Sequence, residues 1–572
     1  MNILSQVEEK KTRKYNIVHR SKQANVLDDA TRGLSQRTLE KKYDISKSTL
    51  QHWIARKEEL KGKVDPNTVE FLESSSGQAF LHTLILGAFL IFHENGNCGI
   101  PALSRFFELT KLSSFVGTSI SALQKVEKSM DKQIINFGSE ETNRLSEDMP
   151  HKLITGALDE NFIMDSMTLI LMDPVSGFIL AEELAKKRDT ETWHKVTQAA
   201  VRGLRVQILQ LVGDEAGGLR KLATDRLQVI KGSDLFHIQQ DITKGLTCHL
   251  ARTIKQVKKT LEDLEKEKLK VLDQLAKKLK QAGGIENLSK RGISAAKRIL
   301  EIEKEEKACQ KSIDTAQARY DEAKETRKAI TDCYHPFNLE TGEKQAPEKV
   351  KEVLEKSYTA LEAIAKEVNS TEKQDQKLQK SKSLIDSMVS VLIFFFSYLS
   401  ATMVSLEIDG SSAKALFEKI VSLEYLKLCL PKAKGKKNKE KIRKTIEKIE
   451  GELEEDPLWI QINPATQTVW LRKALDCAQV FQRSSSCVEG RNGQLSLKFH
   501  AFRRVNSVKL KVLTILHNFF IRRADNTTAA ERFFEQKQRD LFEWLLSNVS
   551  LPARPREKHT RGSGKSQKKQ AA

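Results

Sequence analysis

Apolar residues along this chain follow two spacings, and the first predicts a long helical region. From residue 248 onward apolar residues recur every three or four positions among lysines and glutamates: Ile254, Val257, Leu261, Leu264, Val271, Leu275 and Leu279. This spacing is typical of an antiparallel coiled coil. Gly283-Gly284 should end the first helix, a loop is expected at Tyr334–Glu343, and further helices should continue to about residue 450.

Residues 151–247 show short continuous apolar runs that are typical of buried strands. The five expected strands lie in HKLITGALDENF, in the two halves of MTLILMDPVSGFILAEEL, in VQILQLVGDEAGG and in LQVIKGSDLFH. DTETWHKVTQAAVRGL should form a helix after the third strand, and a short helical piece should precede the fifth. Three strands in a meander, then helix, strand, helix and strand, make a mixed α/β order.

Residues 30–57 have the pattern of a helix-turn-helix. Ser35 is expected to cap a helix that ends near Tyr43, and Ser46 or Ser48 should begin a second helix whose inner face carries Leu50, Trp53 and Ile54. The outer face offers side chains suited to phosphates and base edges. These are Lys47, Thr49, Gln51, His52 and Arg56.

Two apolar stretches need an interpretation, because the longer one could span a bilayer. Met388–Leu406 contains four serines and a threonine, and it lies between highly charged helices, so a helix buried on all sides of a helical domain is predicted. Ala79–Phe92 is shorter, and the N-terminus has no apolar signal segment. A soluble, cytoplasmic protein without membrane partners is therefore expected.

The charge of the chain favours a polyanionic partner. Lysine and arginine number 96 against 76 acidic residues, a net charge of +20 that is spread beyond the basic segments at residues 431–444 and 551–572. Such an excess is typical of nucleic-acid binding. The seven scattered cysteines include no CxxC pair, which favours a reducing compartment over zinc ribbons or disulfides.

Three acids occupy positions suited to metal binding. Asp159 ends an apolar strand, Asp214 lies where the next buried strand opens into a glycine-rich loop, and Glu489 is on a late helix. Cutting a phosphodiester with two divalent cations requires such a cluster of oxygen ligands. Taken singly, each acid has an ordinary explanation: Asp159 polarises a strand end, Asp214 caps a helix, and Glu489 pairs with Arg491.

Glu489 stands alone in a basic neighbourhood, which a metal-binding carboxylate beside a phosphate backbone would explain. The residues expected to contact DNA there are Arg491, Asn492, Lys498, Arg503 and Arg504, with His500 among them. Asn492 follows Glu489 by one turn and should share its face. Glu160 and Glu215 are reserve acids, and His237 is interpreted as a core or loop histidine.

These motifs resemble those of a bacterial insertion-sequence transposase of the DDE type, whose catalytic domain is similar to ribonuclease H and retroviral integrase. The matching segments are ALDENF, VGDEAGG, SDLFHIQQD, SSCVEGRNGQLS and the closing TTAAERFFEQKQRDLFEWLL. The resemblance implies that Asp159, Asp214 and Glu489 bind two Mg²⁺ or Mn²⁺ ions. It further implies hydrolysis at an element end, followed by attack of the freed 3′-hydroxyl on target DNA. Double-stranded DNA and a homodimer or larger assembly are the implied partners.

The expected fold is α+β and mostly helical, with a ribonuclease-H-like core interrupted by a large helical insertion. The expected N-terminal segments are the helix-turn-helix (1–66) and a helical unit that is a second candidate for DNA binding (67–150). The first part of the core (151–247), the coiled-coil insertion (248–469) and the second part of the core with the Glu helix (470–550) should follow, and a basic tail (551–572) ends the chain.

Three alternatives remain open at this level. The chain could be an inactive or repurposed transposase that only binds DNA, a coiled-coil scaffold, or a recombination or repair nuclease with the same metal site. A GxxxxGK[ST] loop is absent from the sequence, so use of ATP is not expected. GxSxG and HExxH are absent too, which argues against serine hydrolase and zinc protease chemistry.

Overall fold

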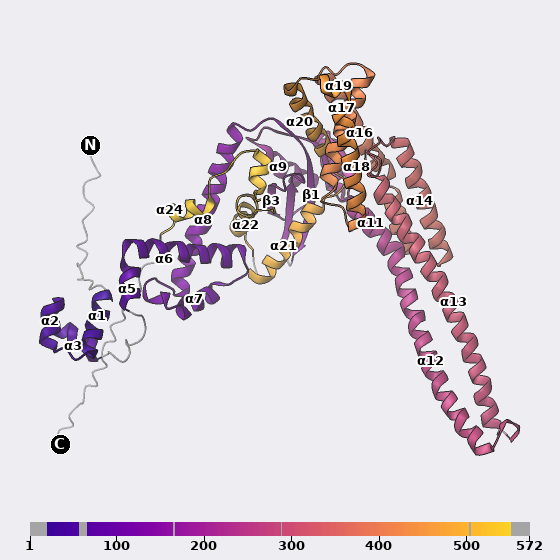
Figure 1. Cartoon of the computed structure of the whole chain (residues 1–572), viewed down its shortest axis with the longest axis horizontal. Coiled ribbons are helices and arrows are strands. Elements are labelled where there is room, and N and C mark those ends of the chain that lie inside the picture. Colours follow the sequence, from indigo (N-terminus) through magenta and orange to yellow (C-terminus); the bar gives the residue numbers. More distant parts are fainter. Residues whose placement is uncertain (1–19, 56–65, 164–165, 288, 503–504, 551–572) are drawn as a thin grey trace. The chain divides into compact units, whose positions relative to one another are not determined.

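The protein is mostly helical with one small mixed sheet, as a computed structural model of the chain shows (Figure 1). The structure describes residues 20–55, 66–163, 166–287, 289–502 and 505–550. These residues form two compact units. Unit 1 comprises residues up to Glu147 together with Ser496–Glu531 and the residues from Gln536 onward, and unit 2 comprises Asp148–Leu495 and Arg532–Glu535. This division is coarser than the six expected segments, whose boundaries stay predictions.

Unit 1 begins with three short helices around a small apolar core. They are α1 (Arg20–Thr31), α2 (Gln36–Tyr43) and α3 (Lys47–Ala55). Val26, Leu39, Ile45, Leu50 and Trp53 are buried between them. The expected caps are confirmed: the hydroxyl of Ser35 accepts from the backbone N–H of Thr38 at 3.3 Å, and that of Ser46 from Thr49 at 3.4 Å.

The rest of unit 1 packs around one long helix, α8 (Ile120–Glu147). The other elements of this part are α5 (Pro66–Glu73), α6 (Ser75–Ala88), the π-helix η1 (Phe89–Asn95), α7 (Ile100–Leu109), the 3₁₀ turn η2 (Leu112–Ser114), α22 (Ser507–Phe519) and α24 (Leu541–Asn548). Of these, α7, α22 and α24 pack directly against α8. Phe137 of α8 makes edge contacts with Phe519 and Trp544. Gly138 is needed beside them, because a Cβ there would lie 2.7 Å from the side chain of Ile515.

Unit 2 contains the five-stranded sheet, in the order β3-β2-β1-β4-β5. β1 pairs antiparallel with β2, β2 pairs antiparallel with β3, and β4 and β5 run parallel to β1. The strands are β1 (Lys152–Ile163), β2 (Ser166–Met172), β3 (Ile179–Ala185), β4 (Val206–Gly213) and β5 (Ile230–Ser233). All five match the apolar runs that the sequence singled out to within one residue, and this confirms a mixed α+β fold.

Short helices connect the strands and cover the sheet. They are α9 (Thr190–Val201), α10 (Gly217–Lys221), η3 (Leu222–Leu227), α11 (Leu235–Ile242) and η4 (Thr243–Thr247). Trp193 of α9 is fully buried against Leu158, Leu169, Leu211 and other apolar side chains of the sheet. Phe178, between β2 and β3, stacks on Phe533 of α23 (Ala529–Phe534), with ring centroids 4.5 Å apart.

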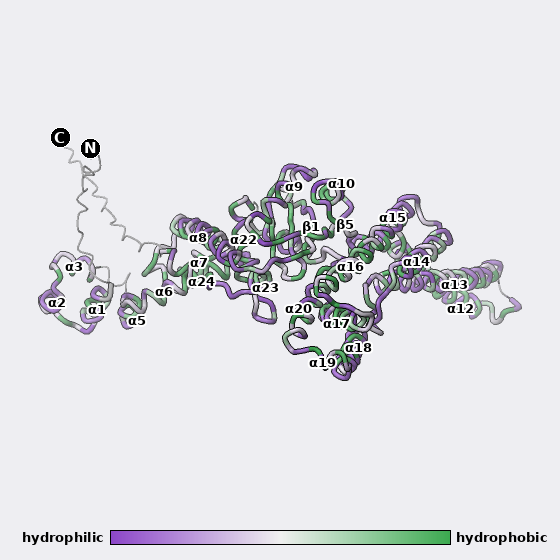
Figure 2. Tube along the Cα trace, turned by 90° about the horizontal axis from the view of Figure 1, so that it is seen from above, coloured by the Kyte–Doolittle hydropathy of each residue, from purple (hydrophilic) through white to green (hydrophobic). Residues whose placement is uncertain are grey.

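The helical insertion begins with the expected coiled-coil hairpin. α12 (Cys248–Ala282) and α13 (Lys290–Cys333) run antiparallel, separated by Gly283-Gly284 and η5 (Ile285–Asn287) (Figure 1). Hydrophilic and hydrophobic residues alternate along both helices (Figure 2). Ion pairs such as Lys268–Glu306, at 2.8 Å, and Arg298–Glu267, at 2.9 Å, join their surfaces.

The insertion continues as a helical bundle around the apolar helix α16 (Ile385–Ser405). The other members are α14 (Pro347–Glu367), α15 (Glu372–Lys382), α17 (Ser411–Cys429), α18 (Lys436–Glu454), α19 (Pro457–Gln461) and α20 (Pro464–Val480). Met388, Leu392 and Phe395 are fully buried, whereas Ile393 is 50% and Val404 74% exposed. The prediction that this helix is buried on all sides was therefore wrong, because only a broad face packs against the bundle.

Two segments are long and apolar enough to cross a membrane by composition alone, Ser75–Asn95 and Glu372–Ser405. Both contribute buried residues to the helical cores of their units, Leu81 and Ile85 in the first and Leu392 and Phe395 in the second. This packing is consistent with a soluble protein.

Candidate functional site

The register of two parallel strands brings Asp159 and Asp214 to the same level. The last pair between β1 and β4 is Ala157 with Val212, and the two aspartates each follow two residues later. Gly213 permits this close approach, because a Cβ there would lie 2.6 Å from the carbonyl oxygen of Leu158. Neighbouring strands lie about 4.8 Å apart. The two carboxylates therefore emerge next to each other where β4 ends.

Two helix starts are tied together beside this strand end. The hydroxyl of Ser485, just before α21 (Ser486–Phe502), hydrogen bonds to the buried carboxylate of Asp234, which also caps α11. The backbone N–H of Leu235 donates to the carbonyl of Arg483 at 2.9 Å. Because both helices begin here, residues in their first turns lie side by side.

Glu489 and His237 are those first-turn residues. The Nε2 atom of His237 lies 3.6 Å from Oε1 of Glu489. One ligand atom from each of Asp159, His237 and Glu489 falls within 4.8 Å of the others, a spacing that permits one ion to contact all three. Asp214 lies close enough for its charge to act on Asp159.

Asn492 orients Asp159. Its Nδ2 atom donates to Oδ2 of Asp159 at 2.7 Å, a partner that the sequence analysis did not name; the expected contact of Asn492 with DNA stays a prediction. Asn161 Nδ2 in turn lies 3.5 Å from the carbonyl oxygen of Asn492. An amide donor that holds one carboxylate oxygen leaves the other oxygen free to bind a ligand.

The electrostatics of the site favour a bound cation. Burial, followed by the nearby charges of Glu489, Asp214 and Glu160, raises the pKa of Asp159 from 3.8 to about 7. Among the described residues, buried Nε2 of His237 and Oδ1 of Asn492 have no hydrogen-bond partner. Clustered carboxylates together with unsatisfied polar atoms fit a divalent cation, whose charge would relieve the repulsion.

A polar cleft of about 390 Å³ opens beside the acids. It is lined by Arg188, Asp214, Glu215, Ala216, Gly217, Gly218, His237, Ile238, Gln240, Asp241, Lys380 and Leu384. Arg188 and Lys380 bring positive charge to a cleft that also carries two of the candidate ligands. This combination suits a phosphate group that is held by a cation and by basic side chains at once.

The two reserve acids are occupied by other partners. Glu160 accepts from Arg188 at 2.9 Å and from the indole N–H of Trp193 at 3.2 Å. Glu215 lies 3.5 Å from the ammonium of Lys231, whose pKa is lowered by burial. Glu160 therefore orients Arg188 at the cleft.

His237 is the site residue that the sequence interpretation missed. It was expected in a core or loop, yet it faces Glu489 in the first turn of α11. The available signal was its position directly after the fifth strand, in DLFH, because the parallel strands β1, β4 and β5 all end at this edge of the sheet. Arg188, Lys231 and Lys380 carried no comparable signal.

Two residues expected to contact DNA have other roles. The side chain of Arg491 is 5% exposed and makes a two-bond ion pair with Glu182, with both distances 2.7 Å. Lys498 donates to the carbonyl oxygens of Glu94 and Asn95, at 3.0 and 2.7 Å, and to that of Gly96. The charge of Arg491 is therefore neutralised by Glu182 inside the protein, and Arg491 does not pair with Glu489. Backbone carbonyls leave the charge of Lys498 in place, so its contact with DNA stays a prediction.

The other residues that the sequence suggested as DNA contacts are placed as follows. His500 is exposed at the end of α21, and Lys47, Gln51 and His52 are exposed on α3 with Thr49 half-buried. Arg56, Arg503 and Arg504 lie outside the described residues.

Asp159→Asn is expected to stabilise the protein in the absence of divalent cations. A pKa raised from 3.8 to about 7 means that charged Asp159 destabilises the folded state above pH 7, by on the order of 4 kcal/mol. This penalty shrinks as the pH falls from 7 toward 4, because the folded protein then binds the proton. Asn keeps an acceptor for Asn492 without the charge.

We expect the Asp159→Asn variant to gain about 1–3 kcal/mol in free energy of unfolding at pH 8, and roughly a third of that at pH 5. Urea denaturation in a chelator at both pH values measures the difference. A variant that is less stable than the unmodified protein at pH 8 would show that Asp159 is not under electrostatic strain.

The fold and the site thus define a mostly helical α+β protein with an acidic cluster at the edge of a mixed sheet. Residues 416–561 match a family described as Family of unknown function (DUF6399). The match includes Glu489 and Asn492 but neither Asp159 nor Asp214. No curated protein matches the chain.

Proposed function

We propose that this protein is a DNA transposase of the DDE type with a ribonuclease-H-like core. The observation that carries the proposal is the position of Asp159, which lies beside Asp214 at parallel strand ends and within 4.8 Å, by its ligand atom, of Glu489 from a helix far along the chain. The sheet order, with an antiparallel meander followed by two parallel strands, supports the same class. We infer that Asp159, Asp214 and Glu489 hold two Mg²⁺ or Mn²⁺ ions.

Bound divalent cations would stabilise charge on the attacking and leaving oxygens of a phosphodiester. The chain's own residues prepare that site. Asn492 holds one oxygen of Asp159 in place, and the Ser485–Asp234 hydrogen bond fixes the helix that presents Glu489. His237 is placed to donate a hydrogen bond to Glu489 or to a phosphate oxygen.

DNA binding is assigned to two surfaces. On α3 the exposed Lys47, Gln51 and His52, with Thr49, are suited to contact the backbone and base edges. In the cleft, Arg188 and Lys380 are suited to hold phosphates next to the acids. Two element ends must be joined in one reaction, so a homodimer or larger assembly on DNA is part of the proposal.

The direct test is cleavage of DNA that carries the sequences flanking the protein's own gene. Purified protein with Mn²⁺ or Mg²⁺ should nick the DNA at a defined terminus, leave a 3′-hydroxyl and join that end to a plasmid. A chelator should abolish both steps without abolishing DNA binding.

The outcomes separate the alternatives. Nicking without joining would favour a recombination or repair nuclease. Tight binding without nicking, with either cation, would favour a repurposed DNA-binding protein. If the protein neither binds nor nicks the DNA, the nucleic-acid proposal fails and the coiled-coil scaffold remains as the alternative.

A further inference from the structure

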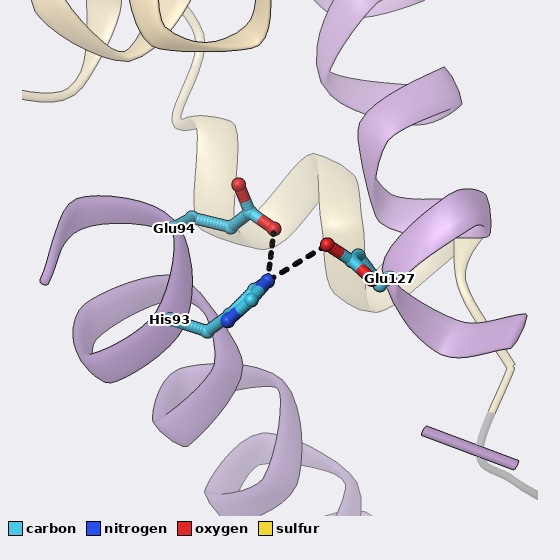
Figure 3. Close-up of side chains that lie close together, drawn as sticks. All are labelled: His93, Glu94 and Glu127. Carbon is cyan, nitrogen blue, oxygen red and sulfur yellow. Dashed lines mark hydrogen bonds and ion pairs between the residues drawn. The ribbon is translucent and has the colours of Figure 1, made fainter. Parts of the chain in front are cut away.

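A second cluster of side chains that could bind a metal lies in unit 1, whereas the acids of the sheet belong to unit 2. His93 and Glu94 end the π-helix η1, and Glu127 projects from α8 (Figure 3). His93 Nε2 lies 2.9 Å from Glu127 Oε1 and 3.7 Å from Glu94 Oε1. One ligand atom from each residue falls within 4.8 Å of the others. Irregular π-helical turns occur often at functional sites.

The imidazole of His93 is oriented as in a metal ligand. Its Nδ1 atom lies 2.7 Å from the carbonyl oxygen of Cys98. A carbonyl only accepts, so Nδ1 carries a proton and Nε2 faces the two carboxylates. Lone pairs of three acceptors cannot face one another unless a proton or a cation lies between them. A histidine whose far nitrogen donates to a carbonyl is the usual arrangement at metal sites.

Glu94 supplies an independent observation. Its side chain is fully buried, and its Oε1 atom, which points toward His93 Nε2, has no hydrogen-bond partner among the described residues (Figure 3). A buried carboxylate oxygen without a partner is costly. The other oxygen, Oε2, is held by the ammonium of Lys509 at 2.5 Å. One oxygen of Glu94 is thus satisfied and the other is available.

The cluster carries a net negative charge that a divalent cation would neutralise. Glu94, Glu127 and Asp131 contribute three negative charges, and Lys509 contacts all three, at 2.5, 3.6 and 3.5 Å. With a neutral imidazole the sum is −3 + 1 = −2, which one divalent cation would bring to zero. Buried excess charge requires such compensation.

The distances match a small tetrahedral ion. Zinc binds imidazole nitrogen and carboxylate oxygen at about 2.0–2.1 Å, which places tetrahedral ligand atoms roughly 3.4 Å apart. The observed separations of 2.9 and 3.7 Å lie on either side of that value. Asp131 lines a cleft of about 280 Å³, which brings solvent to the edge of the cluster.

We propose that His93, Glu94 and Glu127 bind a zinc-class divalent cation that fixes η1 against α8. Lys509 stays on the second oxygen of Glu94 and neutralises the remaining charge, and the fourth ligand is water. The site is structural, and it is separate from the acids that would cut DNA. It therefore does not depend on the proposed function.

The test uses the full chain with the other candidate site disabled by Asp159→Asn and Glu489→Gln. Chelator-treated protein is titrated with Zn²⁺ by calorimetry, and bound metal is counted by mass spectrometry after dialysis. We expect one equivalent of Zn²⁺ per chain and a higher midpoint of thermal unfolding. In the same background, His93→Gln and Glu127→Gln should each weaken Zn²⁺ binding about 100-fold or more. Glu108→Gln, which replaces an exposed acid on α7, is the matched control and should bind as before.

Glu127→Gln protects the test from misfolding, because this side chain is only partly buried and the amide of Gln can donate a hydrogen bond to the unprotonated Nε2 of His93. Absence of Zn²⁺ binding in the disabled background would overturn the proposal and identify the cluster as a proton-bridged ion network. Binding that persists unchanged in both His93→Gln and Glu127→Gln would overturn it as well. A parallel titration with Mn²⁺ is expected to show weaker binding.

Discussion

Asp159→Asn, Asp214→Asn and Glu489→Gln are each expected to lower the rate of DNA cleavage at least ~10³-fold, which corresponds to about 4 kcal/mol of transition-state stabilisation. Each substitution removes one charge from the proposed metal-binding carboxylates. Asp159 and Glu489 offer ligand atoms within 4.8 Å of each other, and Asp214 lies close enough for its charge to act on Asp159. The effect is large because the remaining carboxylates would hold the cations at the wrong place or too weakly. Cleavage of end-labelled DNA in Mn²⁺ measures it.

The control for these variants is Glu183→Gln. Glu183 is an exposed acid on β3 of the same sheet, and its replacement should leave the cleavage rate within a factor of two or so. DNA affinity measured in a chelator should be unchanged or slightly higher in all four variants. If any one of the three acids can be neutralised without loss of cleavage, that residue does not belong to the metal site.

Breaking the Arg491–Glu182 ion pair is expected to have the largest effect on stability. Both side chains are buried, at 5% and 0% exposure, and two hydrogen bonds of 2.7 Å join them. Arg491→Met leaves the carboxylate of Glu182 buried without its main counter-charge, so a loss of about 3–5 kcal/mol in free energy of unfolding is expected. Urea denaturation followed by circular dichroism measures the loss.

The double variant Arg491→Met/Glu182→Leu should recover most of that stability, because a buried ion pair can be replaced by apolar side chains at little cost. Its affinity for DNA should match that of the unmodified protein. The ion-pair interpretation fails if Arg491→Met is stable but binds DNA weakly, since that result would return Arg491 to the DNA-contacting surface.

Local signals account for what could be predicted of the fold. Ser35 caps α2 because its hydroxyl accepts from an N–H only three residues away. The strands β1 to β5 are recognisable in the sequence as apolar runs bounded by turns. The coiled-coil hairpin follows from spacing alone, with Gly283-Gly284 at its end. Such features depend on neighbours within a few residues, so one sequence contains them in full.

The same reasoning explains why the sequence singled out Asp159 and Asp214 and did not single out His237. An acid at the end of an apolar strand stands out, and residues one helical turn apart share a face. His237 meets Glu489 only because Ser485 and Asp234 tie the starts of α21 and α11 together across some 250 residues. No spacing of residues along the sequence predicts that hydrogen bond.

By itself, the sequence determined the helical and strand segments of this protein, its caps, and the positions of three acids at element ends. Only the tertiary structure decided which charges remain available. Arg491 is 309 residues from Glu182, yet the buried ion pair between them neutralises both charges. The tertiary structure also brought His93, Glu94 and Glu127 together. A charge pair depends on three-dimensional approach and burial, which neighbouring residues along the chain do not encode.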